Sequence, residues 1–297
     1  MKAISKCLAV ICTVAVIATC ACNKQSEDSR PVLAVSIEPQ RNILEQLAGD
    51  NFRIITVIPE GESPETFEPT PSKRIDIENS KAYFTTGLLV FEENLKLASN
   101  DDAKFVNTSD GIDLIYEHSH ADNHSMFLPD VAPGEAEIEA DPHIWLSVRN
   151  ARKIAANMTA ELINIDADNA DTYTANYNAL CQRLDSIDNV FKTRIDSIGS
   201  PAFMLWHPSM GYFARDYGLK MITMGHENKE VSATSLKQLI DSAKHENARV
   251  FLYQAQIDSR QAESISSSAG ARLVEFNPLA YDWISELSKV VDELSKQ

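Results

Sequence analysis

Side chains that commonly bind metal ions stand just past several segments that the sequence predicts to be β-strands. Glu65 follows the second such segment, His143 follows the fourth, and His207 directly follows Trp206 at the end of the fifth. In open parallel sheets, ligands bind at the carboxyl ends of the strands, where the connecting loops meet. Two imidazoles and a carboxylate suit zinc, whereas manganese prefers more oxygen donors. These residue types therefore predict a site for a divalent transition metal.

Asp141 and Asn277 occupy comparable positions. Asp141 stands two residues before His143 and can orient that imidazole, and Asn277 follows the last predicted strand. Alternative interpretations exist, because each histidine can be a core residue bonded to the backbone. Glu65 can likewise be a solvated loop acid or a helix cap. The candidate ligands are scattered along the chain, so their spacing alone does not decide between these interpretations.

Glu65 lies in a stretch with an unusual composition. Residues 59–72 read PEGESPETFEPTPS and contain four prolines and four glutamates. Proline fixes its own φ and restricts the residue before it, so the stretch is too stiff for a flexible linker and too irregular for a helix. We therefore expect a rigid loop that presents an acidic side chain.

A second group of histidines lies in a segment with few apolar residues. Residues 115–142 carry His118, His120 and His124 among acids, serines and prolines, which indicates a mobile surface loop. Three histidines within seven residues suggest weak metal contacts. A loop that is merely solvated is the alternative.

Apolar runs alternate with helical patterns on both sides of one long helical segment. Before that segment, strands are predicted at residues 32–37, 54–58, 82–86 and 105–107, and helices at 39–48, 72–80 and 88–98, with Ser72 as the cap of the second helix. After it, strands are predicted at residues 202–206, 221–224, 250–253 and 273–276, and helices at 209–217, 235–245, 261–268 and 283–294. Such alternation predicts mostly parallel sheets with helices on both faces.

Two helices are expected between these halves. Ser147 can cap a helix that runs through Leu162, and a longer helix is predicted from about Asn169 to Ile198. Its apolar residues step by three or four from Tyr173 onward, so one stripe persists along its length. At 1.5 Å per residue this helix would be roughly 45 Å long, which is enough to traverse two domains.

The predicted fold class is α/β, with two similar lobes joined by one long rigid helix. Each lobe is expected to hold a mostly parallel four-stranded sheet flanked by helices. We expect the N-terminal lobe at residues 31–166, with the histidine-containing loop at 116–141, the linking helix at 167–199 and the C-terminal lobe at 200–297. A chain of this length can bury two cores of ordinary domain size.

The first 22 residues have the pattern of a lipoprotein signal peptide. Two lysines precede an apolar core that is short for a transmembrane helix, and its end resembles a bacterial lipobox. We expect cleavage and lipidation at Cys22, with Cys20 as the alternative, and a polar tether at residues 23–30. The protein is then exported and lipid-anchored to a membrane, on the periplasmic side or at the cell surface. A soluble secreted protein is the other possibility.

Cysteine count and charge agree with export and limit the partners. Four of the five cysteines lie in the leader, so the single remaining Cys181 leaves the mature chain without a disulfide of its own. The formal net charge of −16 becomes −18 when Lys2 and Lys6 leave, because residues 1–21 contain no acid. Such a surface argues against nucleic acid as a partner and mildly favours cationic ligands.

Four longer motifs make the chain resemble a known family. They are residues 61–71, the run DPHIWL at 141–146, the run from His207 to Leu219 that ends in GYFARDYGL, and NPLA at 277–280. Together they resemble the metal-binding subunits of bacterial zinc and manganese ABC importers, the solute-binding proteins in which a long helix joins two α/β lobes. The resemblance covers nearly the whole mature chain and is closest to the zinc-binding members.

The resemblance implies roles for individual residues. His143 and His207 match positions where the family has metal-binding histidines. The family usually has a histidine where this chain has Glu65, and it often has an aspartate where this chain has Asn277. A carboxylate at 65 can still coordinate, while the neutral carbonyl of Asn277 can leave the fourth position to water or to Asp282. The loop with His118, His120 and His124 resembles a shortened form of the family's histidine-rich loop.

The function implied is capture of Zn²⁺ in a cleft between the lobes and its delivery to an ABC permease with its ATPase. No catalytic activity is expected, and the protein is expected to be a monomer. Import of manganese or iron, as Mn²⁺ or Fe²⁺, is the main alternative. A zinc-dependent hydrolase is a more distant one, against which stands the lack of a His-Glu-x-x-His motif. A metal-buffering adhesin with the same fold is the third.

Overall fold

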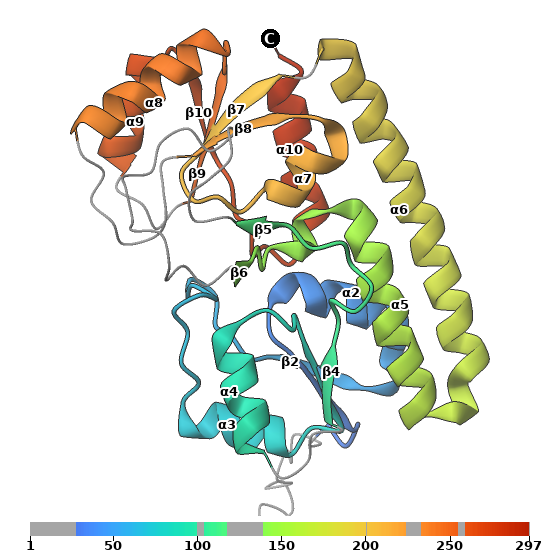
Figure 1. Ribbon diagram of the computed structural model, residues 1–297. Helices are drawn as coiled ribbons and strands as arrows, with labels where there is room; N and C mark the ends of the chain where they lie inside the picture. The colour runs from blue at the N-terminus through green and yellow to red at the C-terminus, as the bar shows by residue number, and fades with distance from the viewer. Residues whose placement is uncertain are drawn as a thin grey trace, which may run out of the picture. The chain divides into compact units, whose positions relative to one another are not determined.

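The computed structural model describes residues 28–99, 104–117, 139–199, 201–223, 233–254 and 259–296 (Figure 1). The expected lipidation sites Cys20 and Cys22 and the loop histidines His118, His120 and His124 lie outside these ranges. In the part of the chain that is described, no helix has both the length and the apolar character that a membrane span requires.

The first sheet has four parallel strands in the order β2-β1-β3-β4. Its strands are β1 (Val32–Val35), β2 (Arg53–Thr56), β3 (Ala82–Thr85) and β4 (Phe105–Asn107). The two central strands are almost entirely buried, as expected for a parallel sheet that helices cover on both faces. The chain places β2 on one side of β1 and then crosses back to place β3 on the other side. The carboxyl ends of β1 and β3 therefore form the topological switch point of this sheet.

Helices cover both faces of the first sheet. The helix α2 (Glu38–Ala48), followed by the short η1 (Gly49–Asn51), lies on one face, while α3 (Pro71–Glu78) and α4 (Val90–Ala98) lie on the other (Figure 1). The side chain of Thr70 accepts a bond from the backbone N–H of Lys73 and caps α3. The predicted cap Ser72 is wrong, because Pro71 already takes the first helical position, for which its fixed φ is suited.

The predicted loop at residues 115–142 begins and ends in a small hairpin. Its strands β5 (Tyr116–Glu117) and β6 (Glu139–Ala140) pair antiparallel. The 3₁₀ turn η3 (Ile144–Leu146) follows, and then α5 (Val148–Ile165), which the Ser147 side chain caps as predicted by accepting from the Asn150 N–H.

The long helix α6 (Ala170–Ile198, 29 residues) follows the short η4 (Ala167–Asn169). It packs on α2 and α5 near its start and on α7 and α10 near its end (Figure 1). The predicted stripe is the packed face, since Tyr173, Leu184 and Ile195 are all buried. Gly199 ends the helix in the left-handed conformation, at φ 74°.

The second sheet repeats the topology of the first. Its strands are β7 (Ala202–Leu205), β8 (Lys220–Thr223), β9 (Val250–Tyr253) and β10 (Arg272–Glu275), all parallel, in the order β10-β9-β7-β8. Its helices are α7 (Gly211–Tyr217), α8 (Ala233–His245), α9 (Ser259–Ala269) and α10 (Trp283–Leu294). Alternate residues serve the two faces: Phe203 and Leu205 join the main core, while Met204 joins a smaller core under α8 and α9.

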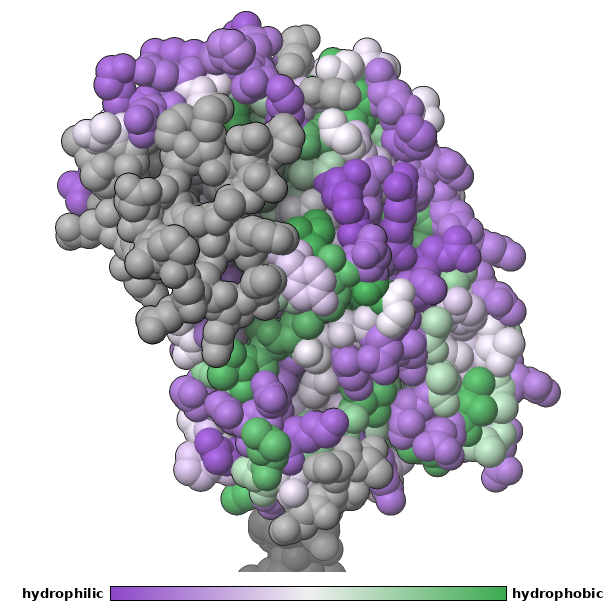
Figure 2. Space-filling model, viewed as in Figure 1, coloured by the Kyte–Doolittle hydropathy of each residue, from purple (hydrophilic) through white to green (hydrophobic). Residues whose placement is uncertain are grey.

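The expected fold class is confirmed: two parallel four-stranded sheets, each flanked by helices, with a long helix between them. The bounds of β4, β9 and α10 match the predicted ones, and those of the other elements differ by one to three residues, as at α4, which begins at Val90 rather than Leu88. The lobe boundaries stay a prediction. Hydrophilic residues dominate the visible surface, while hydrophobic residues gather in a strip between the two sheets (Figure 2).

Candidate metal centre

Glu65 lies in the loop between β2 and α3, and an aromatic contact anchors that loop. The ring of Phe67, two residues further on, is buried and packs edge to face on Phe91 of α4, with 5.1 Å between the ring centroids. Glu65 itself keeps 33% of its side chain exposed. Pro64 and Pro69 restrict the backbone on either side of this anchor. The loop therefore presents the Glu65 carboxylate from a fixed backbone.

His143 lies between the hairpin of β5 and β6 and the η3 turn. The Asp141 N–H donates to the Ile115 carbonyl at 2.8 Å, which continues the hairpin to this point. Asp141 Oδ1 lies 2.8 Å from His143 Nδ1 and also accepts the His143 backbone N–H at 2.9 Å. A proton on Nδ1 then donates to the carboxylate, and Nε2 keeps its lone pair for a metal ion. Asp141 thus sets both the position and the tautomer of this imidazole.

His207 directly follows Trp206, just past β7, at the switch point of the second sheet. Its carbonyl accepts the Ser209 N–H at 2.7 Å, which makes a tight turn around Pro208. The residue is 6% exposed, as is His143. A rigid central strand therefore carries this imidazole into a largely buried position.

The three side chains meet at their metal-binding atoms. Nε2 of His207 lies 3.1 Å from Nε2 of His143 and 3.3 Å from Glu65 Oε1, and His143 Nε2 lies 3.9 Å from the same oxygen. In tetrahedral zinc sites with bonds of about 2.0–2.1 Å, ligand atoms are about 3.3 Å apart. The three separations lie within about 0.6 Å of that value, so one ion can reach all three donors after small shifts. Bound to one ion, the three atoms would occupy one face of its coordination polyhedron.

Charge balance also fits a divalent cation. Glu65 and the buried Asp141 supply two carboxylates to this region, and Asp141 is only 5% exposed. A buried carboxylate is costly unless it is paired and hydrogen-bonded. A divalent ion bound to Glu65 and to the imidazole that Asp141 supports would offset both negative charges. Among the described histidines, cysteines and acids, Glu65, His143 and His207 are the group close enough to share an ion.

The other two predicted ligands make local contacts instead. The Asn277 side-chain oxygen accepts the Leu279 N–H at 3.0 Å. Asp282 caps α10 by accepting the N–H and the hydroxyl of Ser285, at 3.2 and 2.6 Å. Both residues are exposed. The structure therefore brings neither side chain into the cluster, and a role for either as fourth ligand stays a prediction.

Three residues that sequence reasoning did not assign to the site hold Asp141 in place. The hydroxyl of Tyr212 donates to the Asp141 carbonyl at 2.7 Å and accepts the Ile115 N–H at 3.3 Å. Gly211 lies against the Asp141 carboxylate. One feature of the sequence indicates this contact. The GYFARDYGL run has a glycine at the first position of α7, where the backbone does not require glycine.

A cavity of about 950 Å³ adjoins the cluster. Glu65, Asp141 and His143 form part of its wall, and the rest comes mainly from α4 and the carboxyl ends of β3 and β4. A metal ion therefore has an open approach to the donors from this side.

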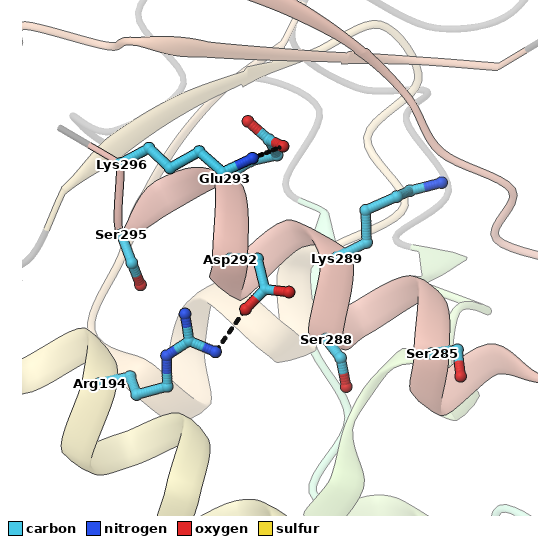
Figure 3. Close-up of a pocket in the computed structure, with 8 residues that line it drawn as sticks. All are labelled: Arg194, Ser285, Ser288, Lys289, Asp292, Glu293, Ser295 and Lys296. Atoms are coloured by element: carbon cyan, nitrogen blue, oxygen red, sulfur yellow. Dashed lines mark hydrogen bonds and ion pairs between the residues drawn. The ribbon is translucent and has the colours of Figure 1, made fainter.

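A second hollow, of about 500 Å³, lies between α6 and α10 (Figure 3). Its cations are paired with acids: Arg194 with Asp292, Lys296 with Glu293, and Lys289 with Glu286. The residues that line it are serines and, apart from Glu286, these charged side chains, without imidazole or thiol. We assign it no metal chemistry, because exposed carboxylates that are already paired with cations are poor competitors for a transition metal.

Comparison with known protein families gives a match over most of the chain. A model of the family described as ZnuA, zinc-uptake complex component A periplasmic, matches residues 33–297. The high-affinity zinc uptake system protein ZnuA of Bacillus subtilis is 28% identical over 249 residues, covering 81% of this chain and 76% of that protein.

Two further relatives carry different names. The zinc-binding lipoprotein AdcA of Streptococcus pneumoniae is 25% identical over 94% of this chain, which spans only 56% of AdcA. The iron ABC transporter substrate-binding lipoprotein MtsA of Streptococcus pyogenes is 24% identical over 75% of this chain and 72% of its own length. Among solved structures, a crystal structure of ZnuA superposes with a TM-score of 0.76 at 33% identity, covering 90% of this chain and 98% of that one.

Proposed function

The chain belongs to the ZnuA family of periplasmic zinc-uptake components, and from this we propose that it is the extracytoplasmic metal-binding subunit of an ABC importer. It captures a divalent transition metal, most favourably Zn²⁺, and delivers it to a membrane permease that an ATPase drives. The observation that carries the proposal is the convergence of Glu65, His143 and His207 on one point.

Zinc is favoured by the donors and by the relatives. Two imidazole nitrogens and one carboxylate oxygen match the ligands of zinc sites. The ZnuA and AdcA relatives are named for zinc. Water, Asn277 or Asp282 would complete the coordination. The separations between the three donors do not select a metal by themselves, so the donor types carry this part of the proposal.

Fe²⁺ or Mn²⁺ is the second candidate cargo. The MtsA relative is named for iron, and a carboxylate at position 65 adds an oxygen donor where the resemblance implies an imidazole. Harder ions gain relative to zinc as oxygen donors replace nitrogen. Competition between zinc and manganese for the metal-stripped protein decides between these two metals as cargo.

We also propose that the protein is tethered by a lipid at Cys22, with Cys20 as the alternative. Relatives named as lipoproteins support an anchored, extracytoplasmic location. The α6 helix bridges both sheets and packs on helices of each. Release of the metal to the permease is therefore expected to use small displacements and loop changes rather than a wide hinge opening.

Calorimetric zinc titration of the metal-stripped mature protein tests the site. Glu65→Ala, His143→Ala and His207→Ala are each expected to weaken binding more than the about 10–100-fold that loss of a supporting residue costs. Glu62→Ala is the matched control, because Glu62 is an exposed acid of the same loop outside the cluster. Wild-type affinity in all three ligand variants would refute the assignment, and absence of zinc binding by the wild type would refute zinc as the cargo.

A further inference from the structure

Gly211 differs from the other described glycines in its backbone. The rest have positive φ, between 58° and 88°, where residues with a side chain are strained: Gly49, Gly61, Gly87, Gly111, Gly199, Gly218 and Gly270. Gly211, at the start of α7, is not among them. Its backbone therefore does not require glycine, and the reason for a glycine there must lie in what surrounds it.

The space at Gly211 is filled by Asp141. A Cβ atom built on Gly211 would lie 2.7 Å from Asp141 Oδ2, 3.6 Å from Ile115 Cδ1 and 3.9 Å from Asp141 Cγ. The first separation is shorter than a van der Waals contact allows, so Asp141 would have to move. The other oxygen of the same carboxylate holds His143 through Nδ1 and the backbone N–H. Any movement of Asp141 therefore disturbs His143.

Tyr212 fixes the backbone of the same aspartate. Its side chain is fully buried, and its hydroxyl bridges the Asp141 carbonyl and the Ile115 N–H. Burial raises the pKa of the Tyr212 hydroxyl to about 12. The hydroxyl therefore remains a donor throughout the physiological pH range.

We propose that Gly211 and Tyr212 are positioning residues of the metal centre, which seat Asp141 so that it aligns His143. The inference rests on the proposed function for its effect on metal binding. It makes α7 part of the site although α7 supplies no ligand. Residues 207–212 then serve both imidazoles, because His207 is a ligand itself and Gly211 and Tyr212 control the other through Asp141. A displacement of this one segment loosens both histidines together.

Gly211→Ala is expected to weaken zinc binding, whereas a glycine without a positioning role would give unchanged zinc affinity. Where the backbone is compatible, replacing glycine by alanine stabilises a protein, because the unfolded chain loses freedom. If nothing opposed the new methyl group, Gly211→Ala would raise the melting temperature and leave the metal affinity alone. If the methyl group displaces Asp141, zinc binding weakens instead.

The test compares zinc Kd values, measured by competition with a chelating dye, for the wild type and three variants. Gly211→Ala is expected to weaken zinc binding about 10–100-fold, the range for loss of a supporting interaction. Tyr212→Phe is expected to act in the same direction by a smaller factor. Gly218→Ala, at the other end of α7 with φ +67° and open space around it, is expected to lower the melting temperature and keep the wild-type Kd.

A double variant tests the route through Asp141. In an Asp141→Ala background the space beside Gly211 is free, so adding Gly211→Ala is expected to raise the melting temperature without further loss of zinc affinity. A further loss as large as in the wild-type background would overturn the proposed route, and an unchanged Kd in Gly211→Ala alone would overturn the proposal.

A measurement without metal separates this inference from the proposed function. The ¹⁵N resonances of His143 report which ring nitrogen carries the proton. The wild type is expected to show the Nδ1–H form, and Gly211→Ala is expected to shift the population away from it. An unchanged tautomer would refute the positioning role even if the wild type bound no metal, whereas failure of the wild type to bind zinc, manganese and iron would refute only the proposed function.

Discussion

Among the three proposed ligands, Glu65 differs from the two histidines in both donor type and exposure. Its carboxylate lies 3.3 Å from the nearer imidazole nitrogen and stays partly open to solvent, whereas both histidines are buried. A carboxylate contributes charge and an oxygen donor, while an imidazole contributes a softer nitrogen donor. The preference among zinc, manganese and iron is therefore expected to depend on this side chain more than on either histidine.

Glu65→His is expected to keep tight zinc binding and to raise the preference for zinc over manganese, because a third imidazole replaces the oxygen donor. Glu65→Gln is expected to weaken the binding of both metals, since the negative charge is lost while the shape is kept. Competition titrations of zinc against manganese for the three proteins measure this. An identical ratio of affinities in the wild type and Glu65→His would contradict a ligand role for position 65.

Between elements, a buried acid of α4 links the ends of two strands of the first sheet by hydrogen bonds. Glu92 is 3% exposed and accepts bonds from the Thr86 N–H, the Thr86 hydroxyl and the Gly87 N–H, each at 2.8 Å, and also from the Ser36 hydroxyl. Ser36 follows β1 and Thr86 follows β3, so one carboxylate ties together both strands of the switch point. Glu92 thus occupies part of the position where a parallel sheet usually binds its ligand and forms part of the wall of the cavity beside it.

This acid predicts a pH dependence of stability. Burial raises the pKa of Glu92 above the ordinary glutamate value of about 4.5, although its hydrogen-bond donors offset part of the rise. The native state therefore holds a proton that the unfolded state has released, and this contribution to stability is lost as pH rises from about 4.5 through the folded pKa. Glu92→Gln removes the titration but replaces one acceptor oxygen by an NH₂ group, which leaves the donors at that oxygen without an acceptor, so the variant is less stable throughout.

The expected result is that the stability deficit of Glu92→Gln relative to the wild type shrinks as pH rises above about 4.5. Denaturant unfolding of both proteins across this range measures the deficit. Glu93→Gln, an exposed neighbour on the same helix, is expected to show a deficit that is small and independent of pH. A deficit of Glu92→Gln that grew with pH would show that the carboxylate is the favoured buried form.

In the molecule as a whole, the larger of the two hydrophobic cores contains residues of both sheets. Leu33 of β1, Leu184 of α6 and Leu205 of β7 belong to the same buried cluster. Specific hydrogen bonds also cross between the halves, since the Trp145 indole N–H donates to the Pro278 carbonyl at 2.8 Å and the Tyr281 hydroxyl donates to Glu45 at 2.6 Å. Residues from both halves therefore depend on each other for burial.

We expect the mature protein to unfold in a single cooperative transition rather than lobe by lobe. Leu184→Ala, at a site that is 1% exposed, is expected to lower stability by about 2–5 kcal/mol and to shift that transition without splitting it. Val190→Ala, on the same helix but 50% exposed, should change stability by no more than about 0.5 kcal/mol. Differential scanning calorimetry decides, and two resolved peaks would contradict a shared core.

The order of strands and helices, the long helix α6 and the candidate donors all follow from sequence patterns. Apolar periodicity is local, so segments such as β4 and α10 were located to the residue. The rule that ligands gather at carboxyl ends of parallel strands points to Glu65, His143 and His207 from the sequence. It pointed equally to Asn277, and the resemblance added Asp282, because a topological rule cannot rank the residues that follow different strands.

Which of these side chains meet depends on tertiary packing. Asn277 and Asp282 both follow β10, yet the Asn277 side chain bonds within a local turn and Asp282 caps α10. Glu65, His143 and His207 converge from three separate loops. Gly211 and Asp141 are in contact although 70 positions separate them in the sequence. Local periodicity carries no information about such a contact, because it depends on how α7 and the β5–β6 hairpin pack, and packing is a property of the whole chain.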